Sequence, residues 1–425
     1  METMRRSEAV SKESPRRITV LALGLRAVPG IAGGVESHCE NLYPLMFEAG
    51  CDVEVVVRSR NADPASGRTW RGLHVTRLWS PRRSGFEAFA HTFLGVLYAG
   101  VRRPDILHLH AIGPAAFTPL AKLLRLRVVV THHGADYERA KWGGFARWLL
   151  KAGERMAMRF ADAVISVSRA NAARLERQYG RAPWSVPNGV PDAALPASDE
   201  ALLELGLEPC RYVLHVGRAV PEKCQDDLIM AFARARMTGW TLVLVGDMSE
   251  HDGFSTRVRA LARETEGVVL AGFRAGEALQ GLIRHAGCFV LPSAIEGFSI
   301  ALLEALSAGC PVLASDIPAN REIPLPATCY FPVGDIDAMA QAMQALCGSP
   351  RSGVWGTLQA HVRREYDWHR IAQRTLRVYR CCLSGEGWTA VGSDSAEGPV
   401  PDITPVRGRT PSPDYADAES DAHRH

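Results

Sequence analysis

The sequence predicts an α/β protein built from two doubly wound, Rossmann-like domains in tandem, each with a parallel sheet. Short continuous apolar runs recur along the chain, which is typical of parallel strands covered on both faces. This pattern stops at a linker rich in Pro, Ala and Asp, residues 191–200, and then starts again. A length of 425 residues suits two domains with some tail.

Residues 16–190 are expected to form the first domain. Three helices are predicted there, over 35–49, 86–101 and 145–160. The first ends at Gly50, a residue type that commonly terminates helices. The second stretch is too short and too polar to span a bilayer. Strands are predicted at 18–23, 53–57, 106–110, 128–132 and 163–168.

Residues 201–360 are expected to form the second domain, followed by terminal helices that end near residue 383. The two ends of the chain, 1–15 and 384–425, are polar or rich in Gly, Ser, Pro and Asp, and are predicted to be disordered. The strands of the second domain are predicted at 212–218, 241–247, 268–273, 288–293 and 311–315.

The composition excludes several classes of protein. A net charge of +3 is too small to indicate nucleic acid as a partner. The 10 cysteines are scattered, without C-x-x-C pairs or zinc-ligand spacing, which favours a reducing compartment. The N-terminus lacks the apolar segment of a signal peptide. We therefore expect a cytoplasmic protein that at most contacts the inner face of the membrane peripherally.

The most informative motif is Glu296-Gly-Phe-Ser-Ile-Ala-Leu-Leu-Glu304, between two predicted strands. It places Glu296 at the carboxyl end of a strand, where open α/β sheets bind ligands. Helical spacing puts Glu304 about two turns further, roughly on the same face. The amides of Gly297, Phe298 and Ser299 are expected at the helix start, where a phosphate or sugar oxygen can bind. An isolated pair of glutamates would instead only complement the helix dipole and face solvent.

In its strand–turn–helix context this motif resembles the Glu-(seven residues)-Glu signature of the retaining glycosyltransferases of family 4, which have the GT-B fold. The resemblance covers nearly all of residues 16–383 and is closest in kind to bacterial polysaccharide and glycolipid enzymes. It implies a cleft between the domains and a return of helices at about 361–383 to the first domain. It also implies that Glu304 holds the ribose hydroxyls of the donor and that Glu296 holds its sugar hydroxyls.

A glycine loop follows the first predicted strand. Gly33-Gly34-Val35-Glu36 lets backbone amides approach a diphosphate, yet it matches neither the Walker loop nor the dinucleotide fingerprint. The resemblance assigns Gly33 and Gly34 to the donor diphosphate, and a plain tight loop is the alternative.

Thr131-His-His-Gly-Ala-Asp136 follows another buried strand, and a histidine there can bind a sugar hydroxyl. By register with the His-Gly pair of the family, the functional residue is His133 and not its neighbour His132. A structural histidine is the alternative.

Arg218 and Lys223 follow the first strand of the second domain. In the resembled family the matching cations hold the diphosphate and neutralise the leaving group, which is electrostatic catalysis. The alternative is ordinary surface charge.

Cys224 stands where the family usually has glycine. Asn188-Gly189 matches the turn that closes the first domain and is expected to act as a hinge.

The predicted helix over 145–160 is amphipathic and basic. Phe145, Trp148, Leu149, Met156 and Phe160 share one face, and Arg147, Lys151, Arg155 and Arg159 lie elsewhere. Such a stripe usually packs in a core with its charges solvated. The alternative is a helix that lies on an anionic membrane.

Together these features predict a retaining hexosyl- or deoxyhexosyltransferase. It would move a sugar from a nucleotide-sugar donor to a hydroxyl of a saccharide or lipid-linked saccharide, in the synthesis of cell-surface polysaccharide or glycoconjugate. Because no Asp-x-Asp metal motif is expected and the Arg218 and Lys223 pair can replace a metal, no metal or other cofactor is expected. Two alternatives remain, a sugar-nucleotide epimerase of the same fold and a nucleotide-binding protein without catalysis.

Overall fold

The computed structural model describes residues 16–30, 33–59, 68–81, 86–139, 142–190, 198–248, 253–347, 351 and 353–388. The predicted disordered end 1–15, residues 389–425 of the predicted disordered tail 384–425, and residues 191–197 of the predicted linker lie outside the described residues.

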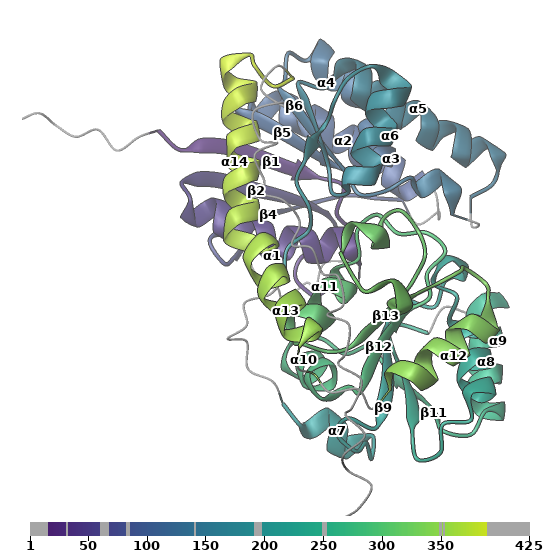
Figure 1. Cartoon of the computed structure of the whole chain (residues 1–425). Coiled ribbons are helices and arrows are strands. Elements are labelled where there is room, and N and C mark those ends of the chain that lie inside the picture. The colour runs from purple at the N-terminus through teal and green to yellow at the C-terminus, as the bar shows by residue number, and fades with distance from the viewer. Residues whose placement is uncertain are drawn as a thin grey trace, which may run out of the picture.

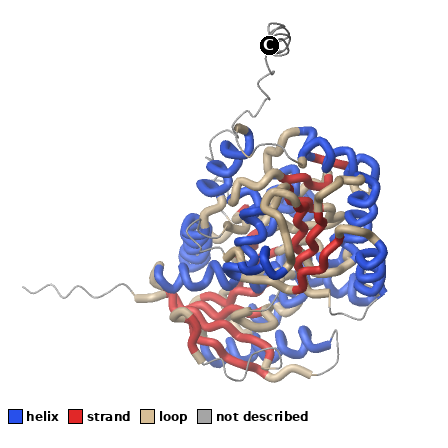
Figure 2. The backbone as a smooth tube through the Cα atoms, turned by 90° about the horizontal axis from the view of Figure 1, so that it is seen from below, coloured by secondary structure: helices blue, strands red, loops and turns tan. Residues whose placement is uncertain are grey.

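Two parallel sheets organise the chain, one above the other in Figure 1. The first sheet has eight strands in the order β3-β4-β2-β1-β5-β6-β7-β8, parallel except for the β3–β4 pair. The second sheet has six parallel strands in the order β11-β10-β9-β12-β13-β14. Figure 2 shows the strands of both sheets lying between helices. The first sheet comprises β1 (Ile18–Leu23), β2 (Cys51–Arg58), β3 (Thr69–Trp70), β4 (Leu73–Leu78), β5 (Ile106–His110), β6 (Val128–His132), β7 (Ala163–Ser166) and β8 (Trp184–Ser185). The second comprises β9 (Tyr212–Val216), β10 (Thr241–Val245), β11 (Val268–Gly272), β12 (Cys288–Leu291), β13 (Val312–Ser315) and β14 (Tyr330–Phe331).

Helices connect the strands and cover the sheets. Those of the first half are α1 (Gly34–Glu48), α2 (Phe86–Arg102), α3 (Ile112–Ala115), α4 (Thr118–Leu123), α5 (Gly144–Phe160) and α6 (Arg169–Tyr179). Those of the second half are α7 (Glu200–Glu204), α8 (Gln225–Ala235), α9 (Gly253–Glu264), α10 (Gly276–His285), α11 (Ile300–Ser307), α12 (Ile336–Leu346), α13 (Val354–Glu365) and α14 (Trp368–Ser384). Short 3-10 turns cover Asp136–Glu138, Pro221–Lys223, Asn320–Glu322 and Ala327–Cys329. No helix in the described part of the chain has both the length and the apolar content needed to cross a bilayer.

The cores explain why the apolar runs are continuous. Alternate residues of β1 enter two different clusters, with Val20 and Ala22 on one face of the sheet and Leu21 and Leu23 on the other. Both faces of the strand are therefore buried, as the sequence pattern predicted. A third cluster fills the second half. The predicted fold class, two parallel α/β sheets in tandem, is confirmed.

The last helices cross from one half to the other. Helix α13 packs against α11 in the second half, and α14 runs back along α1 of the first half, in yellow beside purple in Figure 1. The crossing is fixed where the Val190 amide donates to the Tyr366 carbonyl over 2.7 Å. The return therefore begins at Trp368, the first residue of α14, rather than near 361.

Three expectations differ from the structure. Four strands were not predicted: β3, β8 and β14 have only two residues each, and β4 mixes apolar with polar and charged residues instead of forming an apolar run. Helix α11 begins only at Ile300, so Glu296 lies in the preceding loop and shares no helix face with Glu304. Residues 385–388, assigned to the disordered tail, are held against the first half, where the Trp388 indole donates to the Ala161 carbonyl over 2.9 Å.

The apolar stripe predicted on 145–160 is not core. Phe145 is 78% exposed, Trp148 63% and Phe160 40%. The buried residues of α5 lie on another face, at Leu150, Gly153, Glu154, Ala157 and Met158. The buried face of α5 is therefore not the face of the apolar stripe. Helices α3 and α4 cover α5 along its small residues, such as Gly153 and Ala157, because small side chains allow close approach.

Candidate active site

A salt bridge joins two of the predicted site residues in the second half. Lys223 ends the 3-10 turn after β9, and Glu296 lies in the loop after β12, which is the neighbour of β9 in the sheet. The Nζ of Lys223 lies 2.5 Å from Oε1 of Glu296, with the two side chains 21% and 10% exposed. Adjacent strand ends thus bring a cation and a carboxylate together at the edge where such sheets bind ligands.

Residue 297 lies against the first half of the chain. A Cβ built on Gly297 would meet the backbone oxygen of His133 at 1.8 Å, and a Cβ on Gly134 would meet the Cα of Gly297 at 3.2 Å. The loop that carries Glu296 therefore touches the loop that carries His133, and only glycine fits at 297. The structure brings together His133, Glu296 and Lys223 from both halves.

His133 belongs to a group of buried imidazoles. Its Nε2 lies 3.1 Å from Nδ1 of His110, and its ring meets that of His38 edge-on with centroids 4.9 Å apart. Burial holds the pKa of His133 well below its usual range, helped by the neighbouring His38 and His108. The ring is therefore neutral at physiological pH and can accept or donate a hydrogen bond, but it carries no charge.

The neighbour His132 has a structural role. Its Nε2 contacts Oε2 of Glu154 over 2.9 Å, and its Nδ1 accepts from the amide of Gly134 over 3.2 Å. Glu154 is only 1% exposed, and this burial by itself would raise the pKa of its carboxyl group. The carboxylate also accepts a hydrogen bond from Arg174 over 2.6 Å. The contacts with His132 and Arg174 outweigh the burial and lower the pKa to about 2. A buried carboxylate on α5 thus fixes the turn that presents His133.

The glycine loop is held by an ion pair. Arg26 donates to Glu36 over 2.8 Å, beside the extended Gly33 that precedes α1. A Cβ on Gly33 would lie 2.1 Å from the carboxylate of Glu36, whereas Gly34 has open space around it. A side chain at Gly33 would therefore displace the Arg26–Glu36 ion pair that holds the loop. In the described part of the chain no side chain caps the start of α1.

Phe298 and Ser299 are more buried than expected. The Phe298 ring packs on Tyr366 with centroids 5.4 Å apart, and its carbonyl accepts from the Asn188 side chain over 2.7 Å. The Ser299 hydroxyl caps its own helix by accepting from the Leu302 amide over 3.3 Å. Both side chains therefore serve the fold, and only their amides and that of Gly297 remain for a ligand.

Arg218 and Glu304, the other two charged residues predicted for the site, also belong to the second half. Arg218 follows β9 and is partly buried, and its carbonyl accepts from Gln225 over 2.7 Å. Glu304 lies on α11, where burial raises the pKa of its carboxyl to about 7. Within the described residues, no hydrogen bond or charged neighbour joins the Glu304 side chain to His133 or to the glycine loop. Cys224 adopts a left-handed φ of 51°, the conformation that explains the glycine expected at this position.

One Asp-x-Asp sequence bears on the expected metal independence. Contrary to the expectation that the chain lacks this motif, it contains Asp335-Ile-Asp337. The carboxylate of Asp335 caps α12 by accepting from the Ala338 amide over 2.9 Å, and Asp337 pairs with Arg234. Asp335 therefore caps α12, and Asp337 joins α12 to α8.

Several residues around the site were not predicted. His38 and His110 lie beside His133, Glu154 supports it, and Glu322 bridges the halves by accepting from the Ser168 hydroxyl and the amides of Arg169 and Ala170. The alternation of His108 and His110 in one buried strand was a usable signal, because buried histidines need partners.

The two sheets and the charged, glycine-lined contact between them define a nucleotide-sugar transferase with the GT-B architecture. A model of "Glycosyltransferase Family 4" matches residues 32–194, and one of "Glycosyl transferases group 1" matches residues 210–349. The chain belongs to this glycosyltransferase group 1/family 4, and is a retaining glycosyltransferase of the hexosyltransferase class that transfers sugar from a nucleotide-sugar donor.

Known proteins agree with this assignment along most of the chain. Glycogen synthase of Mycobacterium tuberculosis is 26% identical over 86% of this chain and 95% of its own length. Phosphatidyl-myo-inositol mannosyltransferase of Mycolicibacterium smegmatis is 26% identical over 84% of this chain and 92% of its own length. Among solved structures, sucrose-phosphate synthase of Thermosynechococcus elongatus has a TM-score of 0.73 at 21% identity, covering 87% of this chain and all of that one. HepE of Anabaena, in complex with UDP and glucose, has a TM-score of 0.71 at 20% identity, covering 86% of this chain and all of that one.

Proposed function

We propose that this enzyme transfers a hexosyl or deoxyhexosyl group to a hydroxyl of a saccharide or lipid-linked saccharide, in the synthesis of cell-surface polysaccharide or glycoconjugate. The observation that supports this most is the contact of the His133 loop with the Glu296 loop, because both residues are proposed to bind the donor and they come from different halves of the chain. The relatives include enzymes named for glycogen and for a phosphatidyl-inositol acceptor, so both kinds of acceptor occur in the family.

In this proposal the second half holds the nucleotide. Glu304 binds the ribose hydroxyls, and Arg218 and Lys223 bind the diphosphate, with Gly33, Gly34 and the amides of 297–299 beside it. Lys223 already lies 2.5 Å from Glu296, so binding the diphosphate frees Glu296 to accept from sugar hydroxyls. His133 contacts the sugar from the first half as a neutral ring. The acceptor attacks from the side that the leaving phosphate vacates, and that phosphate takes its proton.

The test is a panel of nucleoside diphosphates and their sugars. A nucleotide that binds at 100 times its dissociation constant stabilises the folded enzyme by about 2.7 kcal/mol, which a thermal shift detects. The sugar form of the best nucleotide is then offered with saccharide acceptors. Sugar found in a new glycosidic product supports the proposal. Isomerised donor without transfer would indicate an epimerase, and binding without any turnover would indicate a non-catalytic nucleotide-binding protein.

Transfer is expected to need no divalent metal, because Arg218 and Lys223 supply the positive charge that a metal would supply. After chelation and removal of the chelator, kcat should stay within about twofold of its original value. Activity that disappears on chelation and returns with magnesium or manganese would contradict this prediction.

Nucleotide affinity is expected to depend on pH through Glu304. Burial raises the pKa of the free carboxyl to about 7, and ribose hydroxyls that donate to it favour the charged form. Binding therefore lowers the pKa. Affinity should be constant above about pH 7 and should fall by up to about tenfold per pH unit below it, because a proton must first be lost.

Calorimetric titrations with a nucleoside test this prediction, since a nucleoside lacks phosphate groups that titrate in the same range. Glu304→Gln should bind more weakly at pH 8 and show a flat profile. A wild-type profile as flat as that of the variant would remove Glu304 from the ribose site.

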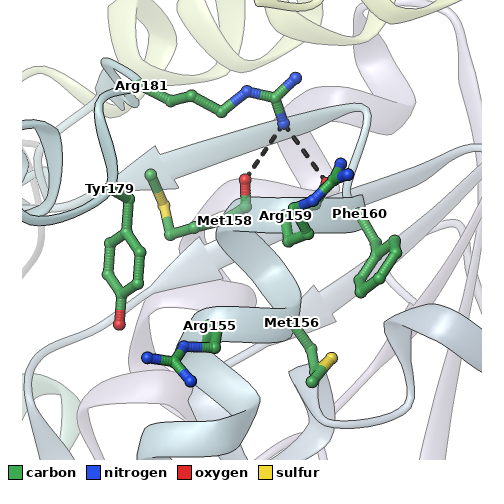
Figure 3. A pocket seen from close by; sticks show the side chains of 7 residues that line it. All are labelled: Arg155, Met156, Met158, Arg159, Phe160, Tyr179 and Arg181. Carbon is green, nitrogen blue, oxygen red and sulfur yellow. Dashed lines mark hydrogen bonds between the residues drawn. The ribbon is translucent and has the colours of Figure 1, made fainter.

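We further propose that α5 places the enzyme on the inner face of an anionic membrane, where lipid-linked acceptors lie. The exposed rings of Phe145 and Trp148 stack with centroids 5.9 Å apart. The exposed cations of α5 have no carboxylate partner within the described residues: Arg147, Lys151, Arg155 and Arg159. At the C-terminal end of α5 lies a hollow of about 460 Å³ (Figure 3), lined by Arg155, Met156, Met158, Arg159, Phe160, Tyr179 and Arg181. Aromatic groups beside unpaired cations complement the interface of anionic lipids.

Vesicle sedimentation tests this surface. Each cation near an anionic bilayer contributes about 1 kcal/mol, so Lys151→Gln with Arg155→Gln should weaken binding to phosphatidylglycerol-containing vesicles by roughly 30-fold. The matched control is Arg263→Gln with Arg284→Gln, two exposed cations of the second half. Equal binding to vesicles of phosphatidylcholine alone, or equal loss in the control, would contradict the proposal.

A further inference from the structure

Three histidines from separate elements meet beneath the contact between the two halves. His38 lies in the first turns of α1, His110 ends β5, and His133 follows β6. Each can offer one ring nitrogen, and these three atoms lie within 4.8 Å of one another. His38 is 2% exposed and His110 is fully buried, whereas His133 is partly exposed. Such a cluster of imidazoles needs an explanation, because buried polar groups normally have partners.

His38 has a nitrogen without a partner. Its Nδ1 lies 2.9 Å from Oδ1 of Asn188, whose amide nitrogen is already used in donating to Phe298. Since Oδ1 only accepts, the hydrogen of His38 lies on Nδ1, and Nε2 carries a lone pair. Nε2 is buried and has no hydrogen-bond partner within the described residues. The cluster therefore contains a buried base with nothing to bind.

The other features suit a metal. Burial lowers the pKa of His38 to about 4 and that of His110 well below its usual range, so the rings are neutral, as ligands must be. A metal-bound imidazole normally donates the N–H of its second ring nitrogen to a fixed hydrogen-bond partner. His38 has Asn188 in that position, and His110 has the hydroxyl of Tyr43 at 2.5 Å.

We propose that His38, His110 and His133 form a binding site for a divalent transition metal ion such as Zn²⁺, and that the ion competes with the donor sugar. Three neutral imidazoles with one further ligand suit Zn²⁺ and Co²⁺, whereas Mg²⁺ prefers oxygen ligands. Zinc bonds of about 2.0–2.1 Å require nitrogens roughly 3.4 Å apart, so the rings must move by about 1 Å. His133 can do so because it lies in a loop. The competition, unlike the binding, rests on the proposed contact of His133 with the sugar.

Metal titration of the purified, chelator-treated enzyme tests the site without any sugar. Co²⁺ should give the intense visible absorption of a tetrahedral complex, and Zn²⁺ should abolish it. In His38→Asn the new amide nitrogen can replace Nδ1 and keep the bond to Asn188, while the ligand nitrogen Nε2 is lost. Affinity should fall more than about 100-fold, since even the loss of an outer-shell partner costs 10- to 100-fold. The His74 side chain is 61% exposed. The variant His74→Asn is therefore the control for adventitious metal binding at a surface histidine.

Octahedral Co²⁺ spectra in the wild type, or equal affinity in wild type and His38→Asn, would overturn the site. If His38→Asn does not fold, as judged by circular dichroism, His133→Asn replaces it, because that side chain lies at the partly exposed edge. For the competition, Zn²⁺ should raise the apparent Kd of the nucleotide sugar and leave that of the nucleoside unchanged. A Kd of the nucleotide sugar that does not respond to saturating Zn²⁺ would overturn the competition alone.

Discussion

Gly297→Ala is expected to lower kcat by roughly 100-fold or more while nucleotide binding is retained. The added Cβ would lie 1.8 Å from the His133 oxygen, so the two loops must separate. That separation moves His133 away from the sugar held by Glu296, and a misplacement of about 1 Å can cost 10²-fold in rate. The nucleotide is proposed to bind on the second half, so its Kd should change little. Steady-state kinetics and calorimetry give the two quantities.

Gly356→Ala is the matched control. That glycine lies inside α13 with nothing within 4 Å of its added Cβ, and alanine there should stabilise the helix by about 0.5–1 kcal/mol without affecting kcat. Small-angle scattering should show a larger radius for Gly297→Ala than for the control in the presence of nucleotide. A wild-type kcat in Gly297→Ala would mean that catalysis does not use this contact.

Lys223→Ala is expected to lower kcat by about 10²–10³-fold, with a smaller change in KM. The ammonium group is proposed to neutralise charge that develops on the leaving diphosphate, so it binds more tightly in the transition state than in the ground state. The variant also leaves Glu296 without its cation, 2.5 Å away in the wild type, and thereby adds a negative charge beside the diphosphate.

The double variant Lys223→Ala with Glu296→Gln separates these two effects. If repulsion by Glu296 dominates, the double variant should be more active than Lys223→Ala. If loss of the cation dominates, it should be no more active. Arg263→Ala, an exposed cation of α9, should leave kcat unchanged. An unchanged kcat in Lys223→Ala would exclude the residue from the mechanism.

Most of the fold was predictable because strand burial leaves a simple signal. Runs such as Val128–His132, buried along their whole length, are continuous in the sequence. Strands β3 and β4 carry no such run, and they are strands because β4 pairs with β2 and β3 pairs with β4. The prediction that the apolar stripe of α5 lies in the core was wrong. Periodicity shows that a helix has an apolar face, but it does not show which face the neighbouring elements cover.

The candidate site was predictable where charge follows a strand end. Lys223 and Glu296 follow β9 and β12, and parallel strands bring their carboxyl ends to one edge. Contacts made across the two halves left no local signal. Nothing in the sequence around Gly297 indicates that its partner is the carbonyl of His133, or that Asn188 donates to Phe298.

The end of α14 sets where the chain can be shortened. The Trp184 indole, 1% exposed, donates to the Gly387 carbonyl over 2.6 Å, and Arg181 lies over the Trp388 ring at 4.7 Å. A chain cut after Leu383 would leave the Trp184 donor buried without an acceptor, which costs about 1–3 kcal/mol. A chain cut after Trp388 keeps both contacts. Protein production for crystallisation is therefore better served by the second boundary, five residues further on.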